Sequence, residues 1–178
     1  MCKAVIAILV ENNTGALSRI TGLFGRRGYN IDSLTVTETN DPGISRITVT
    51  TRGEENVIDQ ILLQTEKLVE CKAVSRQIEN ECIQRELLLV KLAAGPAERP
   101  TLREICDIYK ASIVDLSPRS LVIELTGKPS KIDGFMEMVQ GYEVLESCRT
   151  GVTSIDRGSK TLEYDKTPFA YPAYSQIA

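Results

Sequence analysis

The sequence contains no histidine and no tryptophan among its 178 residues. Without histidine, neither Ser-His-Asp nor Cys-His nucleophilic catalysis is available, and almost every histidine-containing metal site is excluded as well. Aromatic residues make up only 5% of the chain, and the formal net charge is -3. A nucleic-acid surface needs a basic face and often stacking aromatic side chains, so this composition predicts no nucleic-acid partner.

Long apolar runs and paired cysteines are also missing. The longest apolar run covers residues 4–10, whereas a membrane-spanning helix needs about 20 residues, so no membrane association is predicted. Five cysteines are widely scattered without a C-x-x-C motif, and no secretory signal precedes them. We therefore expect a reduced, cytoplasmic protein in which Cys106 and Cys148 are small buried residues.

What is present is a globular composition, with 42% hydrophobic and 25% charged residues. A repeat of pattern divides the chain near residues 79 to 84, and each half reads strand, helix, strand, strand, helix, strand. This predicts an α+β fold of two tandem ferredoxin-like βαββαβ domains, at residues 1–79 and 84–157. The tail at residues 158–178 shows no periodicity and either docks its aromatic residues on a surface or is disordered.

Apolar spacing and turn residues set the expected elements. In the first half we expect strands at 3–10, 31–39, 45–51 and 69–78, a helix at 15–27, and a second helix that starts at Glu54. In the second half we expect strands at 86–93, 111–117, 120–126 and 142–155, the last interrupted by Gly151, and helices that start near Pro100 and at Pro129.

The usual strand order of this fold is 4-1-3-2, which has two consequences for the first half. Strand 31–39 becomes an edge with unpaired backbone groups, and one face of the sheet lacks a cover. Homodimerisation through this edge is the economical solution.

A polar turn at residues 12–15 joins the first strand to the first helix. Asn13 or Thr14 is expected to cap the helix, and Gly15 puts no Cβ between a ligand and the unpaired N–H groups of the first turn. A carboxylate would fit there. Asn30 begins the edge strand that would pair across a dimer, so Asn12 and Asn30 can belong to one site built from two chains.

An amino acid fits the chemistry of such a site. Helix-start N–H groups would bind its carboxylate, asparagine carbonyls would bind its ammonium group, and Leu17 and Ile31 would offer an apolar wall. No base or nucleophile is required. The purely structural alternative is that Asn12, Asn13 and Thr14 only cap the helix and that Asn30 only makes a turn.

The strings LVENNTGALSRITGLFGRRGYNIDSLTV and TNDPGISRITV strongly resemble the regulatory (small) subunits of acetolactate synthase, and QRELLLVK and SCRTGVTSIDRG support the resemblance in the second half. It covers about residues 3–158. It implies an N-terminal ACT domain for effector binding and dimerisation, and a non-catalytic regulatory subunit that activates a catalytic (large) subunit. Thiamine diphosphate, Mg²⁺ and FAD are expected on that partner and not on this chain.

The resemblance also implies feedback inhibition in branched-chain amino acid biosynthesis. The effector would be valine, although the same pocket could prefer leucine or isoleucine. The family's effector residues carry over to Asn12, Gly15, Ala16 and Leu17 from one chain, and to Asn30 and Ile31 from its dimer mate.

The second half departs from this pattern, because Gly95-Pro96-Ala97-Glu98 stands where the first half has the polar turn. We therefore expect no second amino-acid site of the same kind. An acylphosphatase-like hydrolase is disfavoured, because the nearest basic residue, Arg19, lies a full turn inside the helix. An RNA-binding or metal-carrying module is disfavoured by the acidic balance, the sparse aromatics and the missing C-x-x-C.

Overall fold

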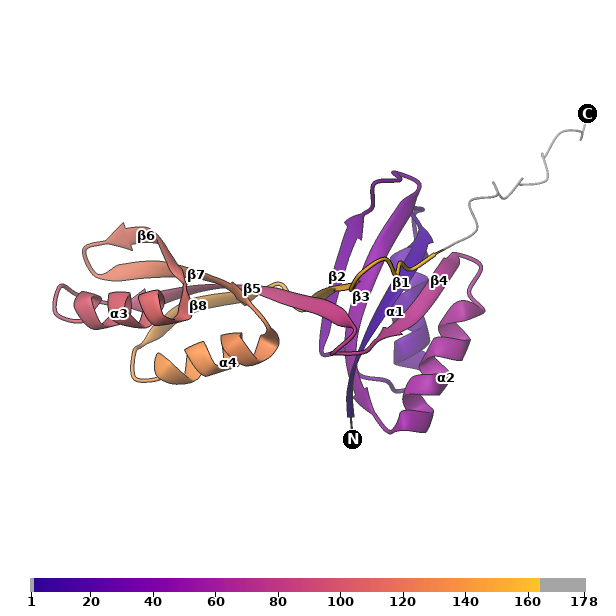
Figure 1. The fold of residues 1–178 in the computed structure, drawn as a ribbon, viewed down its shortest axis with the longest axis horizontal. Coiled ribbons are helices and arrows are strands. Elements are labelled where there is room, and N and C mark those ends of the chain that lie inside the picture. The colour runs from indigo at the N-terminus through magenta and orange to yellow at the C-terminus, as the bar shows by residue number, and fades with distance from the viewer. Residues whose placement is uncertain (1, 164–178) are drawn as a thin grey trace, which may run out of the picture.

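The computed structural model describes residues 2–163 and contains two antiparallel β-sheets, each backed by two helices, which lie side by side along the long axis of the molecule (Figure 1). The first unit comprises residues 2–77 and the second comprises residues 82–156. The first unit has the element order βαββαβ, and the second has the same order followed by one further strand, which confirms the predicted α+β fold class. The predictions for residues 164–178 lie outside the described residues.

The first unit is built around β1 (Cys2–Glu11), an apolar strand that lies in the middle of its sheet and is buried on both faces. Its other elements are α1 (Ala16–Arg26), β2 (Ser33–Glu38), β3 (Ile44–Gly53), α2 (Glu55–Glu66) and β4 (Cys71–Gln77). The strand order β2-β3-β1-β4 confirms the predicted order and leaves β2 at an edge. Both helices cover the same face of the sheet (Figure 1).

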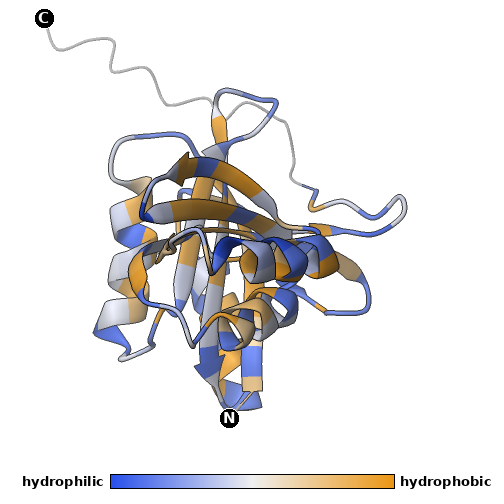
Figure 2. Cartoon of the chain, turned by 90° about the vertical axis from the view of Figure 1, so that its left-hand side faces the viewer, coloured by the Kyte–Doolittle hydropathy of each residue, from blue (hydrophilic) through white to orange (hydrophobic). Residues whose placement is uncertain are grey.

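The second unit repeats this arrangement with the strand order β6-β7-β5-β8. Its elements are β5 (Cys82–Ala93), α3 (Arg99–Tyr109), β6 (Ser112–Ser117), β7 (Ser120–Gly127), α4 (Pro129–Met138), β8 (Val144–Arg149) and β9 (Thr153–Asp156). Figure 2 views the molecule from this end and shows apolar and polar residues alternating along its strands and helices. This alternation places one face of each element in the core.

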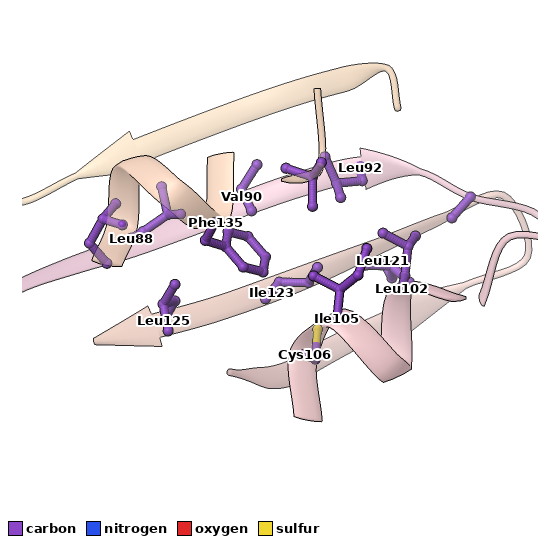
Figure 3. Close-up of a cluster of buried hydrophobic side chains, with 13 residues drawn as sticks. Leu88, Val90, Leu92, Leu102, Ile105, Cys106, Leu121, Ile123, Leu125 and Phe135 are labelled. Carbon is purple, nitrogen blue, oxygen red and sulfur yellow. The ribbon is translucent and has the colours of Figure 1, made fainter. Parts of the chain in front are cut away.

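Each unit has its own hydrophobic core between its sheet and its two helices. In the first, Ile6, Ile8 and Ile47 point from the strands toward Phe24 of α1, and all four are fully buried. In the second, inward residues of β5 and β7 surround Phe135 of α4 (Figure 3). The two cores are separate, since neither cluster contains residues of the other unit.

The closing strand predicted at 142–155 is divided in two. Gly151 adopts φ +82°, a left-handed conformation that interrupts the strand between β8 and β9. Strand β8 pairs with the second half of β5, and β9 pairs with its first four residues, Cys82 to Arg85. Strand β5 therefore starts four residues earlier than predicted, because β9 gives its first residues a partner that the local pattern does not reveal.

The helix-free face of the first sheet is not uncovered, as the sequence had suggested, because the segment 150–156 crosses it. Val152 and Ser154 are 3% and 5% exposed and are buried against this face. Their burial also explains the burial of Thr48 and Thr50, which point to this side of β3. A segment distant in sequence thus ties the second unit to the first sheet.

All five cysteines are free thiols. Cys106 is buried in the second core as predicted, and burial raises its pKa. Burial also raises the pKa of Cys71 to about 11, which makes this thiol a poor nucleophile at neutral pH. The prediction for Cys148 is wrong: this side chain is exposed, because it points from β8 to the face of the second sheet opposite its helices.

Among the described residues, no helix is both long enough and apolar enough to cross a membrane.

Candidate functional site

The turn between β1 and α1 is tighter than the sequence predicted. Gly15, not Asn13 or Thr14, is the N-cap residue, and it adopts φ +92°. The amide of Ala16 donates to the carbonyl oxygen of Asn13 at 3.2 Å, which closes the turn through the backbone alone. The prediction of a side-chain cap is therefore wrong, and glycine is favoured here because its φ is in the left-handed region.

This helix start is open to a ligand. Nothing lies within 4 Å of the position that a Cβ on Gly15 would occupy. No side chain caps the first turn of α1, and none of its first residues is acidic. The three other helices also lack a side-chain cap, so free N–H groups alone do not single out this turn. What distinguishes this turn is Gly15, which has no side chain, together with Ala16, whose methyl group is buried in the core and leaves the approach clear.

Asn12 connects this turn to the hairpin formed by β2 and β3. Its Nδ2 donates to Glu38 Oε1 at 3.0 Å and to the carbonyl oxygen of Pro42 at 2.9 Å. Its Oδ1 accepts from Ser45 Oγ at 3.0 Å, so one lone pair of this oxygen is left for a ligand. Asn12 therefore has a structural role that the sequence did not reveal, because Glu38 and Ser45 are distant along the chain.

Asn30 lies just before β2. Its Nδ2 donates to Asp32 Oδ1 at 2.9 Å, and its backbone oxygen accepts from Thr51 Oγ1 at 2.5 Å. Within the described part of the chain, nothing donates to its side-chain oxygen. This acceptor is free for a ligand with an N–H group.

The two asparagines do not meet within one chain. The amide of Asn12 donates to Gly43 at one end of β3, whereas Asn30 contacts Thr51 at the other end. At about 3.4 Å per residue, Gly43 and Thr51 are about 27 Å apart. Gly15, Ala16 and Leu17 lie with Asn12, and Ile31 lies with Asn30.

The proposed apolar wall is divided in the same way. Leu17 is 40% exposed beside the helix start. Ile31 is half-buried and packs against the first core at the opposite end. Within one chain, Leu17 and Ile31 therefore lie too far apart to form one wall.

Basic side chains contribute little to this turn. The charge of Arg19 is already paired with Glu70, at 3.0 Å. The described residues hold no group of three or more cysteine, aspartate or glutamate side chains suited to a metal ion. The turn can bind an anion through backbone N–H groups, but it offers no guanidinium for phosphoryl chemistry.

The corresponding turn of the second unit is closed. The Glu98 carboxylate accepts from the amide of Gly95 at 2.8 Å. The negative charge of this carboxylate, next to the helix start, would repel an anionic ligand. This geometry gives the physical reason for the expectation of no second site.

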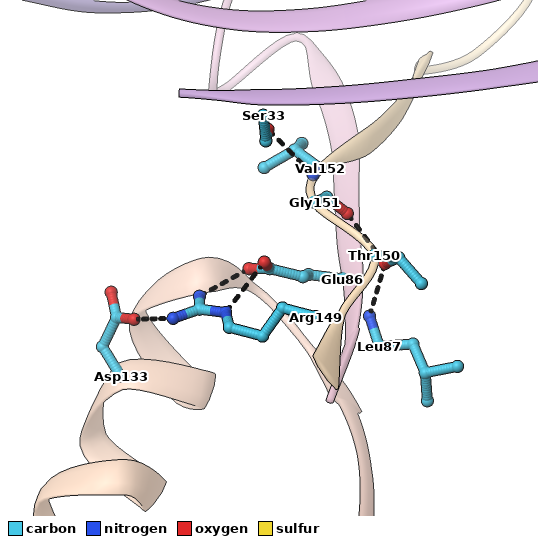
Figure 4. Close-up of polar contacts among 8 residues, drawn as sticks. All are labelled: Ser33, Glu86, Leu87, Asp133, Arg149, Thr150, Gly151 and Val152. Atoms are coloured by element: carbon cyan, nitrogen blue, oxygen red, sulfur yellow. Dashed lines mark hydrogen bonds and ion pairs between the residues drawn. The ribbon is translucent and has the colours of Figure 1, made fainter. Parts of the chain in front are cut away.

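Four residues of the edge strand β2 and of the neighbouring strands β3 and β4 form hydrogen bonds with the segment 150–156, which we call the tether. Thr35 Oγ1 donates to Val152 O at 3.2 Å, and the amide of Val152 faces Ser33 Oγ at 3.5 Å (Figure 4). Two more bonds join the tether to β3 and β4. The tether therefore links the strand that follows Asn30 and Ile31 to the second unit.

Two family profiles match the chain in separate places. The profile described as "AHAS small subunit-like ACT domain" matches residues 6–71, and the one described as "Small subunit of acetolactate synthase" matches residues 85–158. Both matches fall on the units that the structure separates.

Similar proteins extend over nearly the whole chain. The small subunit of acetolactate synthase isozyme 3 from Escherichia coli is 38% identical over 161 residues, which cover 90% of this chain and 99% of the relative. The acetolactate synthase small subunit from Bacillus subtilis is 38% identical over 159 residues, covering 89% and 92%. The crystal structure of the small subunit from Thermotoga maritima superimposes with a TM-score of 0.82 at 31% identity, covering 90% of this chain and 100% of that chain.

Proposed function

This chain belongs to the family of acetolactate synthase small subunits, and from that premise we propose that it activates a catalytic subunit and makes it sensitive to feedback inhibition by valine. Its first unit is an ACT domain, as the sequence predicted, and membership of the family implies a catalytic-subunit partner. In this proposal the chain carries no cofactor, and thiamine diphosphate, Mg²⁺ and FAD belong to the partner.

The observation that carries the proposal is the division of the candidate site between the two ends of one sheet. Asn12 donates to Glu38, the last residue of β2, and Asn30 lies just before the first residue of the same strand. If two copies of the edge strand pair in antiparallel fashion, the start of one β2 lies beside the end of the other. Two-fold symmetry then completes two identical sites, each from two chains.

A branched-chain amino acid suits such a composite site. The open helix start at Gly15 would bind the carboxylate, and the free side-chain oxygen of Asn30 would accept from the ammonium group. Leu17 of one chain and Ile31 of the other would enclose the aliphatic side chain. Binding would then depend on the dimer geometry, which an allosteric effector requires.

The tether offers a route from this site to the second unit. Ser33 and Thr35 follow Ile31 on β2 and contact Val152 directly. Movement of β2 on effector binding would therefore act on β9 and on β5, with which β9 pairs. To be effective, valine must favour one geometry over another, typically by about 1–3 kcal/mol of coupling free energy.

The activating role is tested by measuring acetolactate formation by the purified catalytic subunit with increasing amounts of this chain. We expect stimulation that saturates at a fixed ratio and inhibition of the stimulated activity by added valine. Bovine serum albumin at equal mass controls for non-specific protein effects. A rate that does not rise at any ratio would disprove the assignment of an activating role.

The effector site is tested by a matched pair of substitutions, Gly15→Asp and Gly15→Asn. Both introduce a similar side chain at φ +92°, and asparagine and aspartate both tolerate this region. Only aspartate adds a negative charge at the helix start, where it would repel the effector's carboxylate. We expect Gly15→Asp to weaken valine binding at least tenfold more than Gly15→Asn in titration calorimetry. Equal affinities of the two variants would contradict the pocket.

A further inference from the structure

A hollow of about 530 Å³ lies where the helix-free face of the first sheet meets the start of the second unit. Strands β2 and β3 supply one wall, and β5, the end of β7 and the residues flanking Gly151 supply the other. Its volume is within the range of sites that bind small molecules. None of the six predicted effector residues lines it. We call this hollow the junction pocket.

Two guanidinium groups line the junction pocket. Arg46 donates through Nη2 to Ser154 O at 2.9 Å, but its buried Nε has no acceptor. Arg85 is exposed and donates to the carbonyl oxygen of Gln84 at 2.7 Å. Over residues 2–163, no carboxylate oxygen lies within 4.0 Å of either group. Both positive charges are therefore available to an anion.

The two nearby carboxylates, Glu86 and Asp156, do not form ion pairs with these arginines. Glu86 lines the pocket, but both of its oxygens accept from Arg149, at 2.9 and 2.7 Å. Asp156 accepts weakly from Gln77 at 3.4 Å. Burial lowers the pKa of Arg46, and the charge of Asp156 only partly opposes this. A half-buried cation without a close counter-ion loses part of its hydration, and an anion in the pocket would reduce that cost.

The walls favour an anion with an apolar body. Six of the eleven lining residues are threonines, each of which presents a hydroxyl and a methyl group, and Val36 and Leu87 add aliphatic surface. Thr35 and Thr150 already donate their hydroxyl protons to the backbone oxygens of Val152 and Gly151. With these donors committed, the surface left for a ligand is largely hydrocarbon around a cationic end.

We propose that the junction pocket binds a small organic carboxylate with a short aliphatic body and no amino group. The carboxylate accepts hydrogen bonds from the guanidinium groups of Arg46 and Arg85, a geometry that guanidinium favours. The aliphatic body lies against Val36, Leu87 and the threonine methyl groups. An ammonium group is disfavoured, because Glu86 is already paired with Arg149 and Asp156 does not line the pocket. The site is therefore chemically distinct from the proposed amino-acid site.

Titration calorimetry of the full chain with isobutyrate tests this proposal, with isobutyramide as the uncharged analogue and inorganic phosphate as an anion without an aliphatic body. We expect isobutyrate to bind at one site per chain, and the other two compounds to bind at least tenfold more weakly. Arg46→Met keeps most of the side-chain volume and removes the charge, and it should weaken isobutyrate binding at least tenfold. Arg103→Met, on the exposed face of α3, is the matched control and should leave the affinity unchanged.

Arg46→Met also removes the bond to Ser154, so a second variant separates charge from folding. Arg85 is exposed and bonds only to its own neighbour in the described structure, so Arg85→Met should keep the fold and weaken binding several-fold. Amide NMR should show ligand-induced shifts at Thr126, Thr150 and Thr153. The proposal is overturned if isobutyrate does not bind, if phosphate binds as tightly, if Arg85→Met binds like wild type, or if the shifts are confined to residues 12–17 and 30–31.

Discussion

Replacing Gly151 with alanine is expected to lower the free energy of unfolding by about 2–4 kcal/mol, because it combines backbone strain with a steric clash. Gly151 has φ +82°, and a Cβ at this position would lie 2.7 Å from Ser33 Cβ and 3.0 Å from Ser33 Oγ. Neither the strand nor a β-carbon can move away easily. The clash would push the tether off the first sheet, so urea denaturation should also show reduced cooperativity between the two units.

Two comparisons separate the clash from the strain. Gly158→Ala has a similar backbone conformation, φ +66°, but nothing lies within 4 Å of the new Cβ, so it should cost only about 1 kcal/mol. Ser33→Gly removes the clashing atom, and in the Gly151→Ala background it should restore part of the lost stability, as a double-mutant cycle would report. If the substitutions at Gly151 and Gly158 lower the free energy of unfolding equally, or if Ser33→Gly restores no stability, the tether does not need close contact with β2.

The regular part of the fold could be predicted because its determinants are local. Alternating apolar residues and proline at helix starts each act over a few residues, and the strand order follows from the fold they define. The division of the closing strand could not be predicted, because β9 exists only through its pairing with Cys82–Arg85, about 70 residues earlier. The exposure of Cys148 was missed for a related reason, since alternation predicts two faces but not which one is covered.

The candidate site was predictable only in part. Gly15 could be identified as the opening of the helix start, but its left-handed conformation, which displaces Asn13 and Thr14 as caps, depends on how β1 enters the turn. The structural role of Asn12 depends on Glu38 and Ser45, which the hairpin brings to it. The junction pocket has no motif at all, because Arg46 and Arg85 come from different units. Sites assembled from separate sheets leave no local pattern.

The second large effect is expected at Arg149, which holds together three elements of the second unit. Its Nε and Nη2 donate to both oxygens of Glu86, at 2.9 and 2.7 Å, and its Nη1 donates to Asp133 Oδ1 at 2.9 Å (Figure 4). Glu86 is only 6% exposed, so Arg149→Met leaves a buried carboxylate without its partner. Breaking such a pair on one side costs about 3–5 kcal/mol. The arginine side chain is 37% exposed, so water can reach its position in the variant. We therefore expect the free energy of unfolding, measured by urea denaturation, to fall by about 3 kcal/mol.

The exposed pair formed by Lys91 and Glu146 on the neighbouring strands provides the control. Its charges are 40% and 74% exposed and 3.4 Å apart, so Lys91→Met should cost less than about 1 kcal/mol. The stability lost in Arg149→Met is expected to come from the Glu86 carboxylate, which is left buried without its partner. Adding Glu86→Leu to Arg149→Met should then restore at least half of the lost stability, since both charges are gone. A double variant that is less stable than Arg149→Met would instead show that Glu86 stabilises this region by contacts other than its ion pair.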